Sequence, residues 1–218
     1  MSAWTRLRAH LRLEVARRRL MAPMLVAALP VLGVLLLTPR LAALAYVALL
    51  ALLPPLAAGA AASLWVGDPT LELLYVTPTP GWRIMLGRHA IGLAAYGLAA
   101  VLVAISVELR FGGALLATRP PWAVFAPMLA ASALAATLAL WSRQAAVGAG
   151  AIGILWIGQV LAAHALLTHL WGQRLLWVLA VYGVPRGELL ANAITLIMAA
   201  VAIGICASWL VRCEARYI

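Results

Sequence analysis

The chain has 218 residues, of which 66% are hydrophobic and 10% are charged, and its mean hydropathy is +1.04. This composition excludes a water-soluble globule, because too little polar surface would remain to solvate it, and it predicts an integral membrane protein. The net charge of +10 comes from 16 basic residues, all of them arginines, which fit the cytoplasmic side of a membrane protein and anionic headgroups better than nucleic acid.

Residues 1–19 are expected to form an amphipathic helix at the membrane surface. Four apolar side chains share one stripe of such a helix, whereas most arginines lie elsewhere: Trp4, Leu7, Leu11 and Val15. The first long apolar run begins only near Leu20 and continues to Leu37. A signal peptide would have its apolar segment nearer the start, so we expect no cleaved targeting segment.

Six apolar runs are long enough to cross a hydrocarbon layer of about 30 Å. They lie at residues 20–37, 41–66, 89–109, 122–141, 145–167 and 189–211. The predicted fold is therefore a single all-α transmembrane domain over residues 1–218, with six spans after the surface helix. Pro30, Pro54–Pro55 and Pro127 remove backbone donors inside the first, second and fourth runs, so kinks or breaks are expected, most of all in the second.

The distribution of arginines predicts the orientation of these spans. An even number of spans puts both termini on the same side. With the termini inside, eleven arginines fall on the cytoplasmic side and five on the other. Both termini are therefore predicted to be cytoplasmic.

The segment Gly67–Arg88 is a polar break between the second and third runs. Asp68 can cap a helix that begins at Pro69, and Pro78 and Pro80 force this helix to stop within about eight residues. A helix so short is marginal on its own. We therefore expect it to dock on a partner on the cytoplasmic side.

The stretch 168–188, between the fifth and sixth runs, is expected to form short interfacial or re-entrant helices. Its apolar piece, Leu175–Tyr182, is too short to span. Trp171, Trp177 and Tyr182 suit the headgroup region, because their rings combine an apolar body with a polar edge.

Three smaller patterns have more than one interpretation. Gly148–Gly153 matches the letters of a dinucleotide-binding fingerprint, but it begins an apolar run and no strand precedes it. Its small residues are therefore expected to permit close helix packing, for example at a dimer seam. His164 and His169 are five residues apart, a poor spacing for a metal pair on one helix, and are expected to be interfacial. Glu108 and Arg110 are either an ion pair that lines a path or charges that snorkel to water.

The absence of lysine excludes a Walker A loop, a Schiff-base lysine and a pyridoxal site. The two cysteines, Cys206 and Cys213, support neither a disulfide framework nor a metal site. The sequence suggests no pair of carboxylates, no serine–histidine–aspartate set and no cysteine–histidine pair at one membrane depth. We therefore expect neither an enzyme acting by itself nor a cofactor bound to this chain.

The order of these features resembles the membrane subunits of ABC transporters of the type-2 permease class. In that family a Gly-Thr-Leu-Glu-Leu-Leu pattern lies between the second and third of six spans, and a proline and a glycine–basic pair follow it. Here these places are taken by the run Thr70-Leu-Glu-Leu-Leu, Pro78 and Ile84-Met-Leu-Gly-Arg88. An amphipathic helix before the first span and short helices between the last two also belong to the family's layout.

The resemblance implies that the short helix sits in a cleft of a separate cytoplasmic ATP-binding-cassette ATPase, which holds ATP and Mg. The residues implied at this coupling interface are Asp68, Thr70, Leu71, Glu72, Leu73, Leu74 and Pro78. Glu72 would be a polar contact or anchor, and the leucines would supply apolar docking area. The alternative is a solvated loop helix with Glu72 exposed.

The resemblance implies the permease subunit of an ATP-driven transporter in the plasma membrane, the inner membrane of a bacterium, that exports an amphipathic or hydrophobic substrate. Its partners would be the ATPase, a second permease chain that is identical or similar, and lipids, but not nucleic acid. Two alternatives remain open: a haem-exporter-type permease of cytochrome c maturation, and a non-transporting scaffold that recruits a cytoplasmic protein through residues 68–82.

Overall fold

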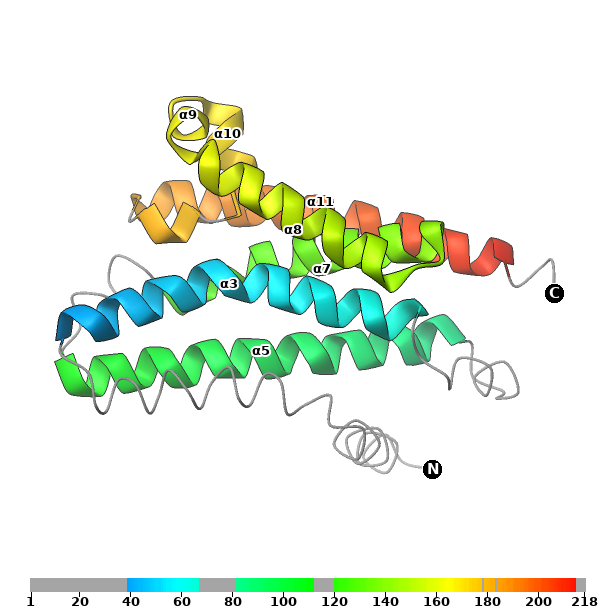
Figure 1. Cartoon of the computed structure of the whole chain (residues 1–218), viewed down its shortest axis with the longest axis horizontal. Coiled ribbons are helices and arrows are strands. Elements are labelled where there is room, and N and C mark those ends of the chain that lie inside the picture. The colour runs from blue at the N-terminus through cyan, green and yellow to red at the C-terminus, as the bar shows by residue number, and fades with distance from the viewer. Residues whose placement is uncertain (1–38, 67–80, 112–119, 178, 183, 215–218) are drawn as a thin grey trace.

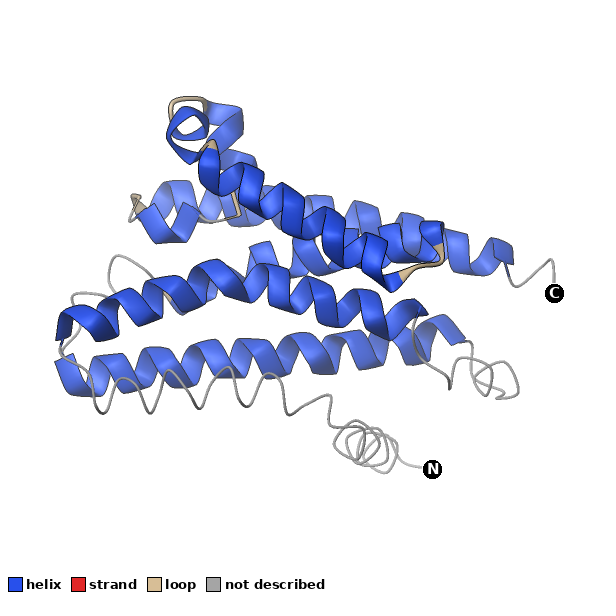
Figure 2. Cartoon of the chain, in the orientation of Figure 1, coloured by secondary structure: helices blue, strands red, loops and turns tan. Residues whose placement is uncertain are grey.

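The computed structural model describes residues 39–66, 81–111, 120–177, 179–182 and 184–214, and every secondary-structure element in them is a helix (Figure 2). The elements are α3 (Pro39–Val66), α5 (Gly81–Phe111), η1 (Pro121–Val124), α7 (Phe125–Ser142), α8 (Ala145–Leu161), α9 (Ala163–Leu167), α10 (Leu170–Leu175), η2 (Leu179–Tyr182) and α11 (Arg186–Glu214). The all-α prediction is confirmed for these residues.

Four described segments are long and apolar enough to cross a membrane: Tyr46–Val66, Arg83–Leu109, Trp122–Ser142 and Arg186–Ala207. They correspond to the second, third, fourth and sixth predicted spans. The chain is therefore an all-α protein with the helices of a membrane protein. The first predicted span and the amphipathic helix at 1–19 lie outside the described residues.

The fifth predicted span, at 145–167, is interrupted in the structure. Helix α8 ends at Leu161, and Ala162, with φ −89° and ψ 3°, turns the chain into α9. The 17 residues of α8 cover about 25 Å at 1.5 Å per residue, just under the hydrocarbon thickness. Hydropathy alone missed this turn, because the run 145–167 stays apolar on average despite Gln159 and His164 on either side of the turn.

The long helices run back and forth along one axis (Figure 1). At one end, on the right in Figure 1, α3 stops, α5 starts, α7 passes into α8, and α11 finishes; we call it the α7–α8 end. The opposite end carries α9, α10 and η2 and is called the α10 end. Segment 67–80 joins α3 to α5, so both of its attachment points lie at the α7–α8 end.

Helix α7 is the central element of the described bundle. It packs against α3, α8 and α11, while α5 packs mainly against α3. Its contacts are made largely by small residues, and these let the helix backbones approach closely. The buried cluster around it consists of Ala58, Ala62, Ala126, Ala130, Ala131, Ala135, Ala139, Ile152, Trp177, Ala193, Leu196 and Ala200.

The pair Pro54–Pro55 does not break α3, which continues as one helix from Pro39 to Val66 and arches in Figure 1. Pro55 has no N–H, so the carbonyl of Ala51, four residues earlier, loses its usual donor. The indole Nε1–H of Trp156 in α8 donates to this carbonyl at 2.9 Å. A neighbouring helix thus supplies the hydrogen bond that the proline removes.

Pro127, which the sequence placed inside a span, lies in the first turn of α7, since the helix begins at Phe125. A backbone N–H at that position has no partner within a helix, so a proline costs no hydrogen bond there. The break expected at Pro127 therefore does not occur, and α7 continues to Ser142. The 3₁₀ helix η1 leads directly into α7 at this point.

The turn between α7 and α8 closes with a left-handed residue. Arg143 has φ 56° and ψ 23°, a conformation in which glycine is usual. Its N–H donates to the carbonyl of Leu140 at 3.3 Å, and the N–H of Gln144 donates to that of Ala139 at 3.2 Å. These two bonds form the Schellman pattern that ends a helix.

Candidate functional site

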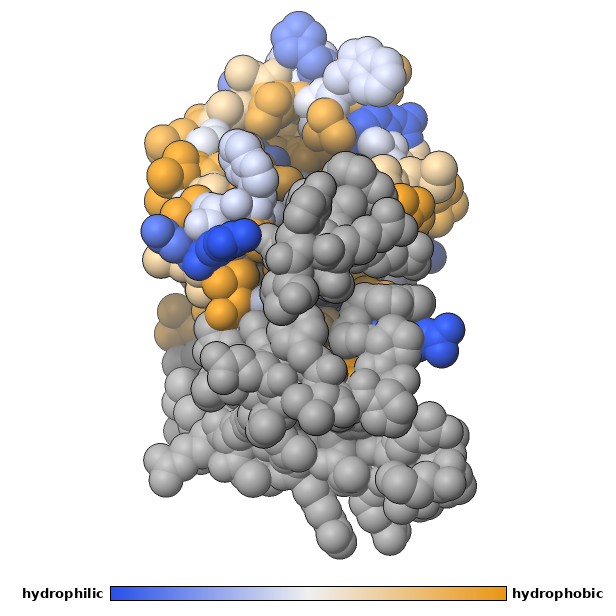
Figure 3. All heavy atoms as spheres, turned by 90° about the vertical axis from the view of Figure 1, so that its right-hand side faces the viewer, coloured by the Kyte–Doolittle hydropathy of each residue, from blue (hydrophilic) through white to orange (hydrophobic). Residues whose placement is uncertain are grey.

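The predicted coupling residues, Asp68 to Leu74 and Pro78, lie outside the described part of the chain. The structure describes the residues that flank them, Val66 at the end of α3 and Gly81 at the start of α5. Figure 3 looks onto this α7–α8 end, where hydrophilic residues stand among apolar ones on the coloured atoms. Arg83 and Arg143 are exposed at this end.

The predicted Glu108–Arg110 pair is described in part. Glu108 lies near the end of α5, at the α10 end, and is partly buried. Its Oε2 atom is buried and has no hydrogen-bond partner among the described residues. The side chain of Arg110 lies outside the described atoms, so the ion pair stays a prediction.

Three polar side chains that the sequence analysis did not single out meet near the α7–α8 end. Trp65 Nε1–H in α3 donates to Nδ1 of His89 in α5 at 3.2 Å. Nε2 of His89 lies 3.1 Å from Oγ of Ser132 in α7, and Ser132 Oγ–H donates to the carbonyl of Leu129 at 3.0 Å. The Trp65–His89–Ser132 network therefore joins three helices.

The chemistry of the donors assigns the tautomer of His89. An indole N–H can only donate, so Nδ1 of His89 must be the acceptor and carry no proton. The neutral ring then has its proton on Nε2, which donates to Ser132 Oγ, and the hydroxyl of Ser132 donates to the carbonyl of Leu129. Within the network each group thus donates to the next, from Trp65 to His89, from His89 to Ser132 and from Ser132 to Leu129. Both nitrogens of the imidazole ring are hydrogen-bonded.

Apolar packing holds the network in place. Trp65 is 5% exposed and Ser132 is 0% exposed. The ring planes of Trp65 and His89 meet edge to face, with centroids 6.3 Å apart and an angle of 71°. Around Trp65 a small core closes the α7–α8 end, formed by Leu64, Trp65, Met85 and Ala136 with Val66 and Leu140 against it.

A small pocket adjoins His89 between α3 and α5. Its lining is almost entirely apolar and consists of Ala57, Ala60, Ala61, Leu64, His89, Gly92, Leu93 and Tyr96. The space open to the centre of a water molecule is about 10 Å³, about the need of a single water. A pocket of this size holds no substrate in the described conformation.

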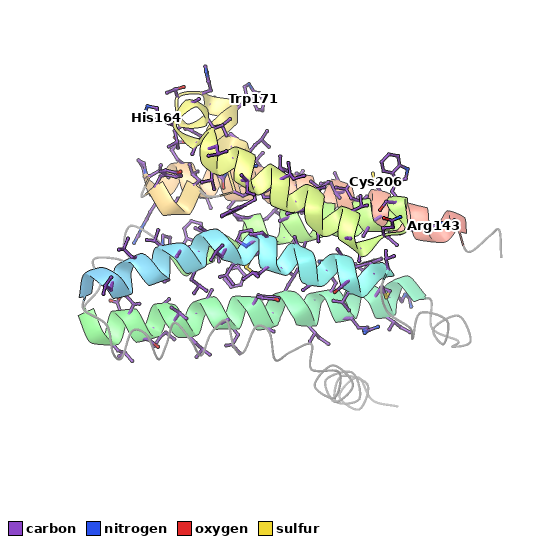
Figure 4. All side chains as sticks on the ribbon, in the orientation of Figure 1. Arg143, His164, Trp171 and Cys206 are labelled. Carbon is purple, nitrogen blue, oxygen red and sulfur yellow. The ribbon has the colours of Figure 1, made fainter. Side chains whose placement is uncertain are left out.

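Nothing in the network matches a metal or catalytic centre. Both ring nitrogens of His89 are engaged, and the described residues contain no group of three or more His, Cys, Asp and Glu side chains that could hold a metal ion. His164 and His169 are exposed, and Figure 4 shows His164 with Trp171 at the α10 end, far from Arg143. The arrangement of Trp65, His89 and Ser132 is suited to fixing three helices relative to one another.

A second polar set fixes the α10 end. Nδ2 of Asn192 in α11 lies within hydrogen-bond distance of three carbonyls at the end of α10: Gln173 at 2.8 Å, Arg174 at 2.9 Å and Leu176 at 3.2 Å. Oε1 of Gln159 in α8 accepts from the N–H of Trp177 at 2.9 Å. These contacts bind the short helices to α8 and α11.

His89 could have been found from the sequence. It opens the apolar run 89–109, and an ionisable residue in a membrane span marks a polar contact or a functional site. Its partners could not have been found, because Trp65 and Ser132 are 24 and 43 residues away.

Comparison of the chain with protein-family models, with curated proteins and with solved structures gives no match.

Proposed function

We propose that the chain is the permease subunit of an ATP-driven ABC transporter of the type-2 permease class, working with separate ATPase subunits and a second permease chain. The chain forms the path across the membrane, and the partner binds and hydrolyses ATP. Alternating exposure of the path follows from differential binding of the partner's ATP-bound and ATP-free forms to two conformations of the permease.

The observation that carries the proposal is the position of segment 67–80. This segment holds the Thr70-Leu-Glu-Leu-Leu run, and it connects two membrane-spanning helices, α3 and α5, at the α7–α8 end. A docking helix at this place acts directly on two spans. The described arginines are divided evenly between the two ends, so the cytoplasmic orientation proposed for this end follows from the six arginines of residues 1–19, which two proposed spans separate from segment 67–80.

Six spans complete the proposed fold. Four are the long apolar helices, the apolar run at 20–37 supplies the first, and α8 supplies the fifth with the short helices beyond it. Ile154, Leu155 and Ile157 of α8 and Ile194 and Met198 of α11 are exposed. Such faces suit lipid and the second permease chain. An amphipathic or hydrophobic substrate, exported from the cell, fits so apolar a path.

The interface itself is tested with Glu72→Arg. A reversed charge in the docking cleft leaves a polar partner unpaired, so we expect association with the ATPase to weaken about ten-fold or more. The measurement is the amount of ATPase that co-purifies with the chain from its native membrane. Leu73→Asp is expected to do at least as much harm, because it puts a charge into apolar docking area.

Glu214→Arg is the matched control, since it reverses an acidic residue predicted on the same side of the membrane but outside segment 67–80. It is expected to leave co-purification unchanged. Equal amounts of ATPase with all three variants would remove the segment from the interface. Equal membrane levels of the variants show that insertion is intact.

A further inference from the structure

The Trp65–His89–Ser132 network lies close to the two points at which segment 67–80 joins the bundle. Trp65 is one residue before the end of α3, and His89 is in the third turn of α5. These are the two helices that the segment joins. Both are connected through His89 to Ser132, in the middle of α7.

Helix α5 depends on this connection more than its neighbours do. It packs mainly on α3 and makes few contacts with α7. One of them is the insertion of the Phe125 ring against Gly97, nearer the α10 end, where a Cβ on Gly97 would collide with the ring. At the α7–α8 end, the hydrogen bond from His89 to Ser132 joins α5 to α7 directly.

Helix α7 is the element through which a movement reaches the rest of the bundle, since it packs against α3, α8 and α11. The hydrogen bonds of the network use every donor and acceptor of the imidazole, so a rotation of α5 against α7 breaks at least one of them. A bond broken in these apolar surroundings leaves a polar group unpaired, and the small pocket beside His89 has room for about one water to replace it. The ends of α3 and α5 and the middle of α7 therefore favour moving together.

We infer that the Trp65–His89–Ser132 network makes the ends of α3 and α5 move as one body with α7, and that His89 is the positioning residue that relays movement of segment 67–80 into the bundle. The coupled movement of α3, α5 and α7 involves only this chain and does not depend on the proposed function. The relay rests on the proposed function. Two separate readouts therefore test the two parts.

The first readout is a distance between spin labels on α5 and α7, measured by pulsed electron resonance on the chain in lipid nanodiscs. Labels are placed at Gly87, where an added side chain meets open space, and at Trp141, which is 77% exposed; Cys206 and Cys213 are first replaced by serine. We expect one narrow distribution in the parent chain. Ser132→Ala and His89→Phe should broaden or shift it.

Two further variants separate the network from general packing. His89→Gln keeps an acceptor for Trp65 and a donor for Ser132, and is expected to restore the narrow distribution. Thr137→Ala removes a hydroxyl of α7 that bonds only to the carbonyl of Ala133 in its own helix, and should change nothing. A distribution unaffected by Ser132→Ala and His89→Phe would overturn the inference, as would equal broadening by Thr137→Ala.

The second readout is the ATPase rate of the co-purified complex, normalised to the amount of bound ATPase. His89→Phe should leave binding intact and lower the rate about five-fold, the low end of typical coupling between sites, and His89→Gln should recover it. A normal rate alongside a broadened distribution would overturn the relay. Absence of any ATPase from the parent preparation would overturn the proposed function and with it the relay, whereas the distance result would still decide the rigidity.

Discussion

Arg143 is the only non-glycine residue with positive φ in the described part of the chain. Left-handed backbone costs a residue with a Cβ about 1–2 kcal/mol relative to glycine. Arg143→Gly should therefore be more stable than Arg143→Ala by about 1 kcal/mol, although both lose the same guanidinium. Thermal unfolding of the two variants in one detergent measures the difference, and equal stabilities would show that the turn relaxes to another conformation.

Gly148 lies where α8 crosses α7. A Cβ at this position would meet the backbone carbonyl of Ala135 and lie 2.9 Å from Cβ of Ala139. Gly148→Ala should therefore push the helices apart and destabilise the protein by about 1–3 kcal/mol.

Gly150 is the matched control for Gly148, because it lies in the same helix and an added Cβ there meets nothing within 4 Å. Gly150→Ala should be neutral or slightly stabilising, since alanine favours helix over glycine. The melting temperatures of the Gly148→Ala and Gly150→Ala variants are compared with that of the parent chain. Equal effects of the two substitutions would contradict the close approach at Gly148. The predicted small-residue packing thus occurs within the chain at Gly148, while a dimer seam stays a prediction.

At the scale of elements, α3 and α8 depend on each other through Pro55. Trp156→Phe removes the donor to the carbonyl of Ala51 and is expected to cost about 0.5–2 kcal/mol. Pro55→Ala returns a backbone N–H that can bond to the same carbonyl. The cost of Trp156→Phe should therefore fall in the Pro55→Ala background, as measured by a double-mutant cycle of unfolding free energies. Additive effects would show that the two donors do not share this carbonyl.

The short helices at the α10 end depend on Asn192. Asn192→Leu keeps most of the side-chain volume but removes the donors to the carbonyls of Gln173, Arg174 and Leu176. We expect faster amide exchange across residues 170–177 and a loss of about 0.5–2 kcal/mol. Thr195→Val, whose hydroxyl bonds only to Ala191 in its own helix, is the control, and identical exchange in both variants would rule out this role.

The described helices could be predicted from the sequence in outline, because four apolar runs of sufficient length coincide with them. The predictions failed where geometry depends on partners. Pro54–Pro55 were expected to kink or break the second span; α3 arches but does not break, and Trp156, a hundred residues away in the chain, supplies the missing donor. The turn at Ala162 has no proline signal, and the polar residues near it, Gln159 and His164, leave the run apolar on average. The network at His89 could be anticipated in one residue only, because its other members are ordinary in an apolar run.

At the scale of the whole molecule, the chain has two ends with different chemistry. Asn192, Gln159 and the short helices hold the α10 end together. Exposed arginines occur at both ends, but the turn at Arg143 and both attachment points of segment 67–80 lie at the α7–α8 end. This difference suits the proposed permease. A cytoplasmic ATPase would act on the α7–α8 end, and α7 would transmit the movement to the helices packed against it.

The most direct test of this account is purification of the chain from its native membrane in mild detergent, followed by identification of the bound proteins and assay of ATP hydrolysis. We expect a stoichiometric ATP-binding partner without membrane spans, with ATP hydrolysis that is lost from the preparation when the chain carries Glu72→Arg. Recovery of the chain alone, or with a partner that does not hydrolyse ATP, would contradict the permease and favour a membrane scaffold.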